Sequence, residues 1–173
     1  MALTEKELIA RAEITEVLTA YAQAQDQNEW DLFDKVFTED AVLEFPGAGI
    51  GTLSPVQLKT FLKDVFNTTR ISGQHALANT IFEIDGGRAR AVSEVYYLTL
   101  QTTDKEGILK RIRGNAIYVD DLVHTNGEWR IRHRVTAQKN VETDDVEYAP
   151  ELIATIRNTN RLRWISQTEE IEE

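Results

Sequence analysis

The feature that most constrains the fold is a change of hydrophobic period near residue 72. Upstream of it, apolar side chains recur at helical spacing, and downstream they alternate with polar side chains. The alternating segments are residues 73–84, 89–102, 108–123 and 128–139. The short sequences DGG, TDKEG and TNG, all typical of turns, separate them. This arrangement predicts four long antiparallel strands paired in consecutive order.

Three helices are predicted upstream of these strands and one downstream. TEKE at Thr4–Glu7 has the spacing of a capping box and begins the first helix. Asn28 is expected to cap the second helix, and SPVQ at 54–57 has the cap, proline and glutamine that begin the third. The second helix has the apolar stripe Trp30, Phe33, Val36 and Phe37. AVLEF is a short strand candidate, and the last helix is expected from Pro150 to about Trp164.

Helices followed by a run of antiparallel strands predict an α+β domain, with helices packed on one side of a sheet. In the first long strand, simple alternation places Leu77 and Ile81 on one face and Ala76, Phe82 and Ile84 on the other. Both faces therefore carry apolar residues. We expect the helices to cover one face and a second copy of the chain to cover the other.

The length of 173 residues predicts one domain. We expect its α+β body to span 1–145, with a C-terminal helix and an acidic tail of the same domain over 146–173. The net charge of −10 disfavours binding to nucleic acid. The chain has no cysteine, no apolar run long enough to cross a membrane, and an acidic N-terminal segment unlike a signal peptide. These features favour a cytoplasmic protein that does not bind membranes.

The chain contains three histidines, His75, His124 and His133. His124 lies in a predicted turn, and His133 alternates with Ile131 and Val135 on a strand. His75 stands early in the first long strand. Because a single histidine is more often structural than catalytic, a partner is needed to distinguish one of them.

Asp26 is a candidate partner for His75. It follows Leu18 and Ala22 at helical spacing, so it borders the core-facing stripe of the first helix. A buried carboxylate needs a partner, and a histidine on the facing sheet would satisfy it. The carboxylate would then fix the ring tautomer and make the histidine a usable general base. The alternative is that Asp26 ends the first helix in water or caps the second helix.

Tyr21 precedes Asp26 by five residues on the same stripe. Its hydroxyl either bonds to backbone in the core or donates to a substrate oxygen. The sequence contains no phosphate loop, dinucleotide fingerprint, HExxH motif or metal-spaced ligand cluster. Catalysis is therefore expected to need no cofactor and no metal.

Three runs carry a family resemblance: YAQAQDQNEWDLFDKVFTEDAVLEF, GQHALANTIFEIDGGRARAVSEVYY and NGEWRIRHR. They resemble the SnoaL-like branch of the nuclear-transport-factor-2-like superfamily over about residues 5–140. The match is closest to the lyase group that includes scytalone dehydratase, the bile-acid 7α-dehydratases and hexachlorocyclohexane dehydrochlorinase. The resemblance implies a curved antiparallel sheet wrapped into a cone, with helices closing a deep pocket.

The resemblance also implies roles for particular residues. Asp26 and His75 match the aspartate–histidine pair of that lyase group, Tyr21 matches a tyrosine of the bile-acid enzymes, and Arg134 matches a pocket arginine of the dehydrochlorinase. Scytalone dehydratase has a second catalytic histidine, where Tyr96 stands here, so that exact activity is not implied. Arg134 would need a β-bulge to reach the pocket, because Trp129 and Ile131 occupy the opposite strand face. Tyr96, Trp30, Phe33 and Asn79 are the residues expected to contact substrate.

Three functions follow as hypotheses. The first is a cofactor-independent lyase acting on a small, mostly apolar cyclic substrate through His75 and Asp26. The second is an isomerase or polyketide-type cyclase that uses the same base. The third is a non-catalytic ligand-binding or assembly domain, which predicts that His75 and Asp26 lie apart or that side chains fill the pocket. A homo-oligomer is expected, with a trimer favoured by the resemblance and a dimer as the alternative.

Overall fold

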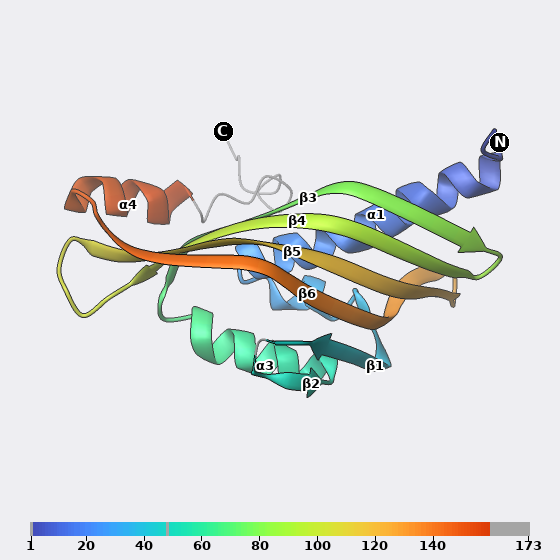
Figure 1. The fold of residues 1–173 in the computed structure, drawn as a ribbon, viewed down its shortest axis with the longest axis horizontal. Helices are drawn as coiled ribbons and strands as arrows, with labels where there is room; N and C mark the ends of the chain where they lie inside the picture. Colours follow the sequence, from blue (N-terminus) through green and yellow to red (C-terminus); the bar gives the residue numbers. More distant parts are fainter. Residues whose placement is uncertain (1, 48, 160–173) are drawn as a thin grey trace, which may run out of the picture.

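The computed structural model describes residues 2–47 and 49–159 (Figure 1). Its helices are α1 (Glu5–Asp26), α2 (Trp30–Phe33), α3 (Pro55–Phe66) and α4 (Pro150–Thr159). Its strands are β1 (Phe37–Phe45), β2 (Gly51–Leu53), β3 (Arg70–Asp85), β4 (Arg88–Thr102), β5 (Ile108–Thr125) and β6 (Glu128–Glu147). The strands form one curved sheet in the order β2-β1-β6-β5-β4-β3. The predicted α+β fold is confirmed.

Strands β3 to β6 form the predicted antiparallel meander, and β2 pairs with β1 in the same sense. The pair β1–β6 is parallel, so the sheet is not antiparallel throughout. Strand β2 has no counterpart in the prediction. Strand β6 continues to Glu147 rather than ending at 139, pairing with β5 along its whole length.

Two helix starts follow from local capping. The Thr4 hydroxyl accepts from the Glu7 amide and the Glu7 carboxylate accepts from the Thr4 amide, which completes the predicted box at α1. Ser54 and Gln57 make the same exchange at α3, with Pro55 at the first helical position.

The cap predicted at Asn28 is wrong. Asn28 has a left-handed backbone with φ of 57°, and α2 is a four-residue turn that begins after Glu29 without a side-chain cap. Val36 lies in a turn and Phe37 begins β1, so these two residues extend no helix. Helix α4 begins at Pro150 as predicted. Its expected end near Trp164 lies outside the described residues, as does most of the acidic tail.

One β-bulge reverses the faces of β3. The register between β3 and β4 shifts between Ala78 and Ile81, and Asn79 there has φ of 52°. Leu77 and Phe82 therefore both pack against the core, whereas Ile81 is 68% exposed. Simple alternation, which grouped Leu77 with Ile81, was wrong because it assumed an unbroken strand.

The main core lies between α1 and the inner face of the sheet. Helix α1 crosses this face, while α3 lies beside β1 and β2 at the sheet edge (Figure 1). Ile14 and Leu18 of α1, Val95 of β4, Leu122 of β5 and Ile131 of β6 are at most 2% exposed. Burial of such side chains contributes about 1.5–3 kcal/mol each, so this layer fixes the end of α1 against the sheet.

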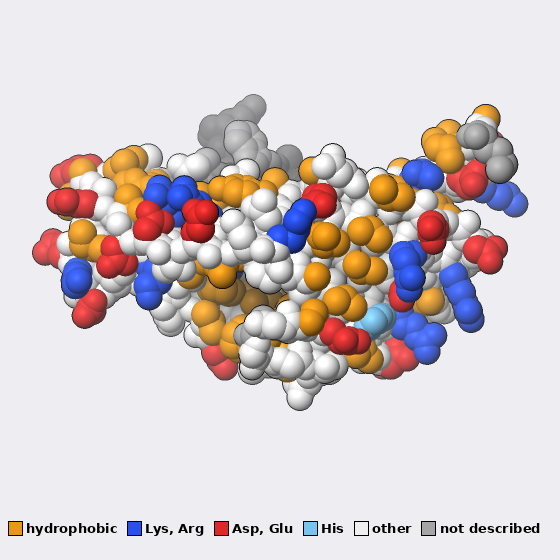
Figure 2. Space-filling view, in the orientation of Figure 1, with side chains coloured by type: hydrophobic (Ala, Val, Ile, Leu, Met, Phe, Trp, Pro, Cys, Tyr) orange, Lys and Arg blue, Asp and Glu red, His pale blue; other side chains and the backbone are white. Residues whose placement is uncertain are grey.

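The outer face of the sheet is covered in part. Ile153 and Ile156 of α4 pack near Ile71, Leu100 and Leu109 at one end of the meander. Further along, Ile81, Val92, Val119 and Val135 form one row across four strands. Hydrophobic side chains gather on this face in Figure 2. Among the described residues, none of the helices has the length and apolarity that crossing a membrane requires.

Candidate active site

A cavity of about 200 Å³ lies between α1, α3 and the inner face of the sheet. Figure 2 shows a hollow lined by hydrophobic side chains beneath the sheet, on the side of α3. Apolar walls come from Leu58, Phe61, Leu62 and Phe66 of α3. The polar groups of its lining include Tyr21, Gln25, Arg70, His75, Tyr97, Thr99, Tyr118 and Thr136. A hollow with apolar walls on which several polar groups converge is typical of a small-molecule site.

Asp26 and His75 are in direct contact at this cavity. His75 Nδ1 lies 2.5 Å from Asp26 Oδ1, and the His75 backbone N–H donates to Asp26 Oδ2 over 2.7 Å. Both side chains are 8% exposed. The last residue of α1 thus holds one residue of β3 by both carboxylate oxygens. With the proton on Nδ1, this N–H donates a hydrogen bond to the carboxylate, and Nε2 is the ring nitrogen left for the cavity.

Tyr21 lines the same cavity one turn upstream on α1. Its ring packs edge-on against Phe37 and Tyr118, with ring centres 5.7 and 5.8 Å away. Burial raises the pKa of the Tyr21 hydroxyl, and the nearby Arg134 charge opposes that rise. The hydroxyl therefore keeps its proton at neutral pH and can donate it.

Arg134 stands behind Tyr21. The register between β5 and β6 shifts at this point: Ile131 pairs with Leu122, and His133 pairs with Asp121. This β-bulge, expected from the sequence, turns the Arg134 side chain toward the inner face of the sheet. The guanidinium is fully buried, bonds to Asp120 over 2.5 and 2.8 Å, and lies 4.0 Å from the centre of the Tyr21 ring. Arg134 is not among the cavity-lining residues, so its expected catalytic role in the pocket is corrected. Its guanidinium packs instead against the rings of Tyr21 and Tyr118.

The charge state of this pair follows from its geometry. Burial raises the pKa of the Asp120 carboxyl, and Arg134 opposes that rise. Burial also works against the charge of Arg134, but Asp120 and the two tyrosines outweigh it and raise the pKa of the guanidinium. The bidentate contact opposes the loss of either charge. Asp120 was not predicted, although the doublet Asp120–Asp121 in a strand must place one acid on the inner face.

Tyr97, rather than Tyr96, reaches the cavity. Tyr97 pairs with His75 across β3 and β4 and stacks on its ring at 5.9 Å, whereas Tyr96 is 46% exposed on the outer face. The assignment of Tyr96 to substrate contact is therefore corrected. Gly114 lies opposite Tyr97, and a Cβ there would stand 2.6 Å from the Tyr97 hydroxyl. The absence of a side chain at Gly114 therefore makes room for the Tyr97 ring.

Arg70 is a further cavity residue that the sequence reasoning missed. Its guanidinium stacks 3.6 Å from the centre of the Phe66 ring, and Nη1 donates to the Gln25 carbonyl oxygen. Burial lowers the pKa of Arg70 to about 10, so it remains a cation at neutral pH. Its place at the start of a strand, outside any motif, offered no signal.

A family model described as a SnoaL-like domain matches residues 6–135. The chain belongs to the SnoaL-like domain family. Uncharacterized proteins of Mycobacterium bovis and Mycobacterium tuberculosis are 31% identical to it over 134 residues, which are 77% of this chain and 88% of theirs.

Solved structures share the fold of this SnoaL-like protein. A protein of Kribbella flavida aligns with a TM-score of 0.67 at 23% identity, over 76% of this chain and 92% of that one. A hexachlorocyclohexane dehydrochlorinase of Novosphingobium barchaimii aligns with a TM-score of 0.69 at 18% identity, over 83% of this chain and 96% of that one. A putative scytalone dehydratase of Novosphingobium aromaticivorans aligns with a TM-score of 0.70 at 18% identity, over 85% of this chain and 95% of that one. A nuclear-transport-factor-2-like protein of Salmonella enterica aligns with a TM-score of 0.63 at 17% identity, over 75% of this chain and 90% of that one.

Three residues expected to contact substrate lie elsewhere in the SnoaL-like domain. Phe33 is 1% exposed and packs in the core against Tyr21. Trp30 packs beside Phe33, and its ring N–H donates to the Asn67 side chain over 3.2 Å. Asn79 is exposed at the bulge of β3. None of the three belongs to the cavity lining, so those assignments are corrected.

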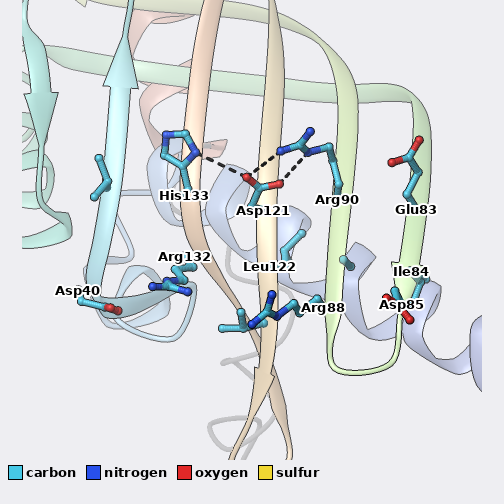
Figure 3. A pocket seen from close by; sticks show the side chains of 13 residues that line it. Asp40, Glu83, Ile84, Asp85, Arg88, Arg90, Asp121, Leu122, Arg132 and His133 are labelled. Atoms are coloured by element: carbon cyan, nitrogen blue, oxygen red, sulfur yellow. Dashed lines mark hydrogen bonds and ion pairs between the residues drawn. The ribbon is translucent and has the colours of Figure 1, made fainter.

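A larger hollow of about 770 Å³ lies on the outer face of the SnoaL-like sheet (Figure 3). Figure 3 shows Arg90 and His133 pointing toward Asp121. Arg90 donates to Asp121 over 2.7 and 3.0 Å, and His133 Nε2 lies 2.7 Å from Glu44. The His133 side chain is 35% exposed. These groups are paired with one another at the surface, so this hollow is the weaker candidate for chemistry.

Within residues 2–47 and 49–159, no three His, Asp or Glu side chains come together as a group that could hold a metal ion.

Proposed function

We propose that this protein is a cofactor-independent lyase of the dehydratase or dehydrohalogenase type, with His75 as its general base. The observation that carries the proposal is the 2.5 Å contact between His75 Nδ1 and Asp26 at the wall of a partly open cavity. Membership of the SnoaL-like family supports it, as does a fold shared with a dehydrochlorinase and a putative dehydratase.

In the proposed step, His75 Nε2 removes a proton from a carbon of the substrate. The electron pair of that C–H bond becomes the new carbon–carbon π bond, and the bond to a hydroxyl or halide on the adjacent carbon breaks. Asp26 stabilises the imidazolium that forms, because the carboxylate already holds Nδ1. General-base catalysis of this kind contributes about 10²–10⁴ in rate.

Tyr21 is proposed to assist the leaving group. Its protonated hydroxyl lines the cavity, so it can donate to a departing hydroxide and form water. The phenolate then recovers its proton from the His75 imidazolium, which returns both residues to their starting states. A departing halide would need only the hydrogen bond.

An isomerase or polyketide-type cyclase remains the alternative reaction. The same base can return the proton to another carbon, or generate a carbanion that closes a ring, without expelling a group. Product analysis separates these outcomes, since a lyase product lacks the elements of water or of a hydrogen halide.

The non-catalytic alternative predicted that Asp26 and His75 lie apart or that side chains fill the cavity. The 2.5 Å contact and the cavity of about 200 Å³ favour an enzyme over a binding or assembly module. The cytoplasmic location stays a proposal that rests on the absence of cysteine.

The test is a screen of small cyclic β-hydroxy carbonyl compounds and chlorinated rings, with products read by mass spectrometry. With the substrate found, His75→Ala and Asp26→Asn should each lower kcat/KM by at least about 100-fold. The chain offers a matched control in its second histidine–carboxylate pair, so His133→Ala and Glu44→Gln should leave turnover unchanged. Near wild-type turnover by folded His75→Ala would contradict the proposed base.

A further inference from the structure

Three buried polar atoms of the cavity lining have no hydrogen-bond partner among the described residues. They are Arg70 Nε, Thr99 Oγ1 and Thr136 Oγ1. Leaving a buried donor or acceptor unpaired costs about 1–3 kcal/mol, so a native fold rarely gathers three around one space. Their common feature is that each can donate a hydrogen bond to an oxygen placed in the cavity.

The Arg70 side chain extends along β3 toward His75. A Cβ added at Gly73 would stand 3.3 Å from Arg70 Cδ and 3.5 Å from Nε, so the arginine side chain lies over this glycine. Gly73 is two residues before His75 and pairs with Thr99 on β4. Arg70 Nε and Thr99 Oγ1 therefore belong to the same end of the cavity.

Thr136 belongs to the other end. It pairs with Tyr118 across β5 and β6, and Tyr118 packs edge-on against Tyr21. The cavity thus has a cationic end at Arg70 and Thr99, and the neutral hydroxyls of Tyr21 and then Thr136 line it further along. His75 contributes to the wall of the same cavity.

The volume limits what can occupy this space. A cavity of roughly 150 Å³ accommodates benzene, so about 200 Å³ accommodates one six-membered ring with one or two small substituents. The walls from α3 are apolar and suit the ring itself. The guanidinium at one end suits a carboxylate, because Arg is a multiple donor that carries a permanent charge.

We propose that the substrate of this site is a compact cyclic hydroxy-carboxylate whose carboxylate is bound by Arg70 Nε and Thr99 Oγ1. Its hydroxyl faces the Tyr21 hydroxyl, which lines the same cavity. This inference rests on the proposed lyase function for the fate of the hydroxyl, but the carboxylate subsite is a binding property that can be measured without turnover.

The experiment compares two probes of equal shape, cyclohexanecarboxylate and cyclohexanecarboxamide, by isothermal titration calorimetry on the full chain. Wild-type protein is expected to bind the carboxylate about 10- to 100-fold more tightly than the amide. Arg70→Gln should abolish this preference, and Arg70→Lys should retain part of it. Arg113→Gln is the control, because Arg113 is an exposed arginine paired with Glu142 on the sheet surface.

Thr99→Val keeps the proposal testable if Arg70→Gln fails to fold. This substitution is isosteric and should weaken carboxylate binding several-fold with little change for the amide. Equal binding of the two probes by wild type, no binding of either, or a preference that survives in folded Arg70→Gln would overturn the proposal.

His75→Asn separates this inference from the proposed function. The variant should keep the carboxylate preference while losing turnover. If His75→Asn keeps both the carboxylate preference and normal turnover, the carboxylate subsite stands and only the role of His75 as the base is refuted. If it loses turnover and shows no carboxylate preference, only the carboxylate subsite is refuted.

Discussion

The buried pair Arg134–Asp120 lends itself to a stability test. Both side chains are fully buried and joined by two hydrogen bonds of 2.5 and 2.8 Å. Asp120→Asn keeps the size of the side chain but leaves the Arg134 charge without its counter-ion, and an arginine cannot release its proton. Breaking one side of a buried ion pair costs about 3–5 kcal/mol. The faces of Tyr21 and Tyr118 still contact the guanidinium, which favours the lower end of that range.

The assay is urea unfolding followed by circular dichroism, with thermal unfolding beside it. In a chain of this size, the expected loss corresponds to a fall in Tm of roughly 6–20 °C. Glu142→Gln is the matched control, since it breaks an exposed pair with Arg113 and should cost no more than about 1 kcal/mol. A loss below about 1 kcal/mol for Asp120→Asn would refute the assignment of a buried, charged Arg134.

Three further outcomes are expected. Gly114→Ala should destabilise the fold by about 1–3 kcal/mol in urea unfolding, because the new methyl group meets Tyr97 and a backbone oxygen. Gly87→Ala should cost less than half as much, because a Cβ there would lie at an ordinary contact distance of 3.8 Å from the His124 carbonyl oxygen. Burial raises the pKa of Tyr21 and of Tyr118, so in the folded state they should ionise only above their ordinary pKa of 10 in an ultraviolet titration. Because the unfolded chain loses these protons first, stability should fall as the pH rises above about 10, and Tyr21→Phe should reduce that fall. The homo-oligomer stays a prediction, for which sedimentation equilibrium should give a mass of two or three chains and a single-chain mass would contradict it.

Much of the fold could be predicted because its signals are local. The capping boxes at Thr4 and Ser54 use residues three apart, and the three turn sequences each fix a strand boundary to within a few residues. The pairing of Asp26 with His75 needed one long-range step. A carboxylate on the buried stripe of a helix requires a partner, and few side chains of the facing sheet can serve.

The errors about which strand residues face the cavity came from bulges, which leave no periodic signal. If the register of Asp85 with Arg88 continued unbroken, His75 would lie opposite Leu98 and share its face with Tyr96. The extra residue at Asn79 places Tyr97 opposite His75 instead. The bulge in β6 turns Arg134 inward, but this residue pairs with Asp120 beneath the tyrosines and does not reach the pocket that the family resemblance implied.

Other site residues could not be found because their roles depend on several elements at once. Arg70 reaches the cavity only because Gly73 leaves room for its side chain and Phe66 of α3 covers its guanidinium. Thr99 and Thr136 are ordinary strand residues until the sheet curves over α3 and buries their hydroxyls. Such convergence depends on tertiary packing rather than on residue spacing.

The central claim is that Asp26 holds His75 with its proton on Nδ1 and leaves Nε2 free to act as a base. The most direct test is nitrogen-15 long-range correlation NMR of the histidine rings, which distinguishes the two neutral tautomers and needs no substrate. The account predicts that His75 is protonated at Nδ1 when neutral, and that Asp26→Asn disturbs this tautomer while Glu44→Gln does not. A neutral His75 protonated at Nε2, or one unaffected by loss of the Asp26 charge, would contradict it.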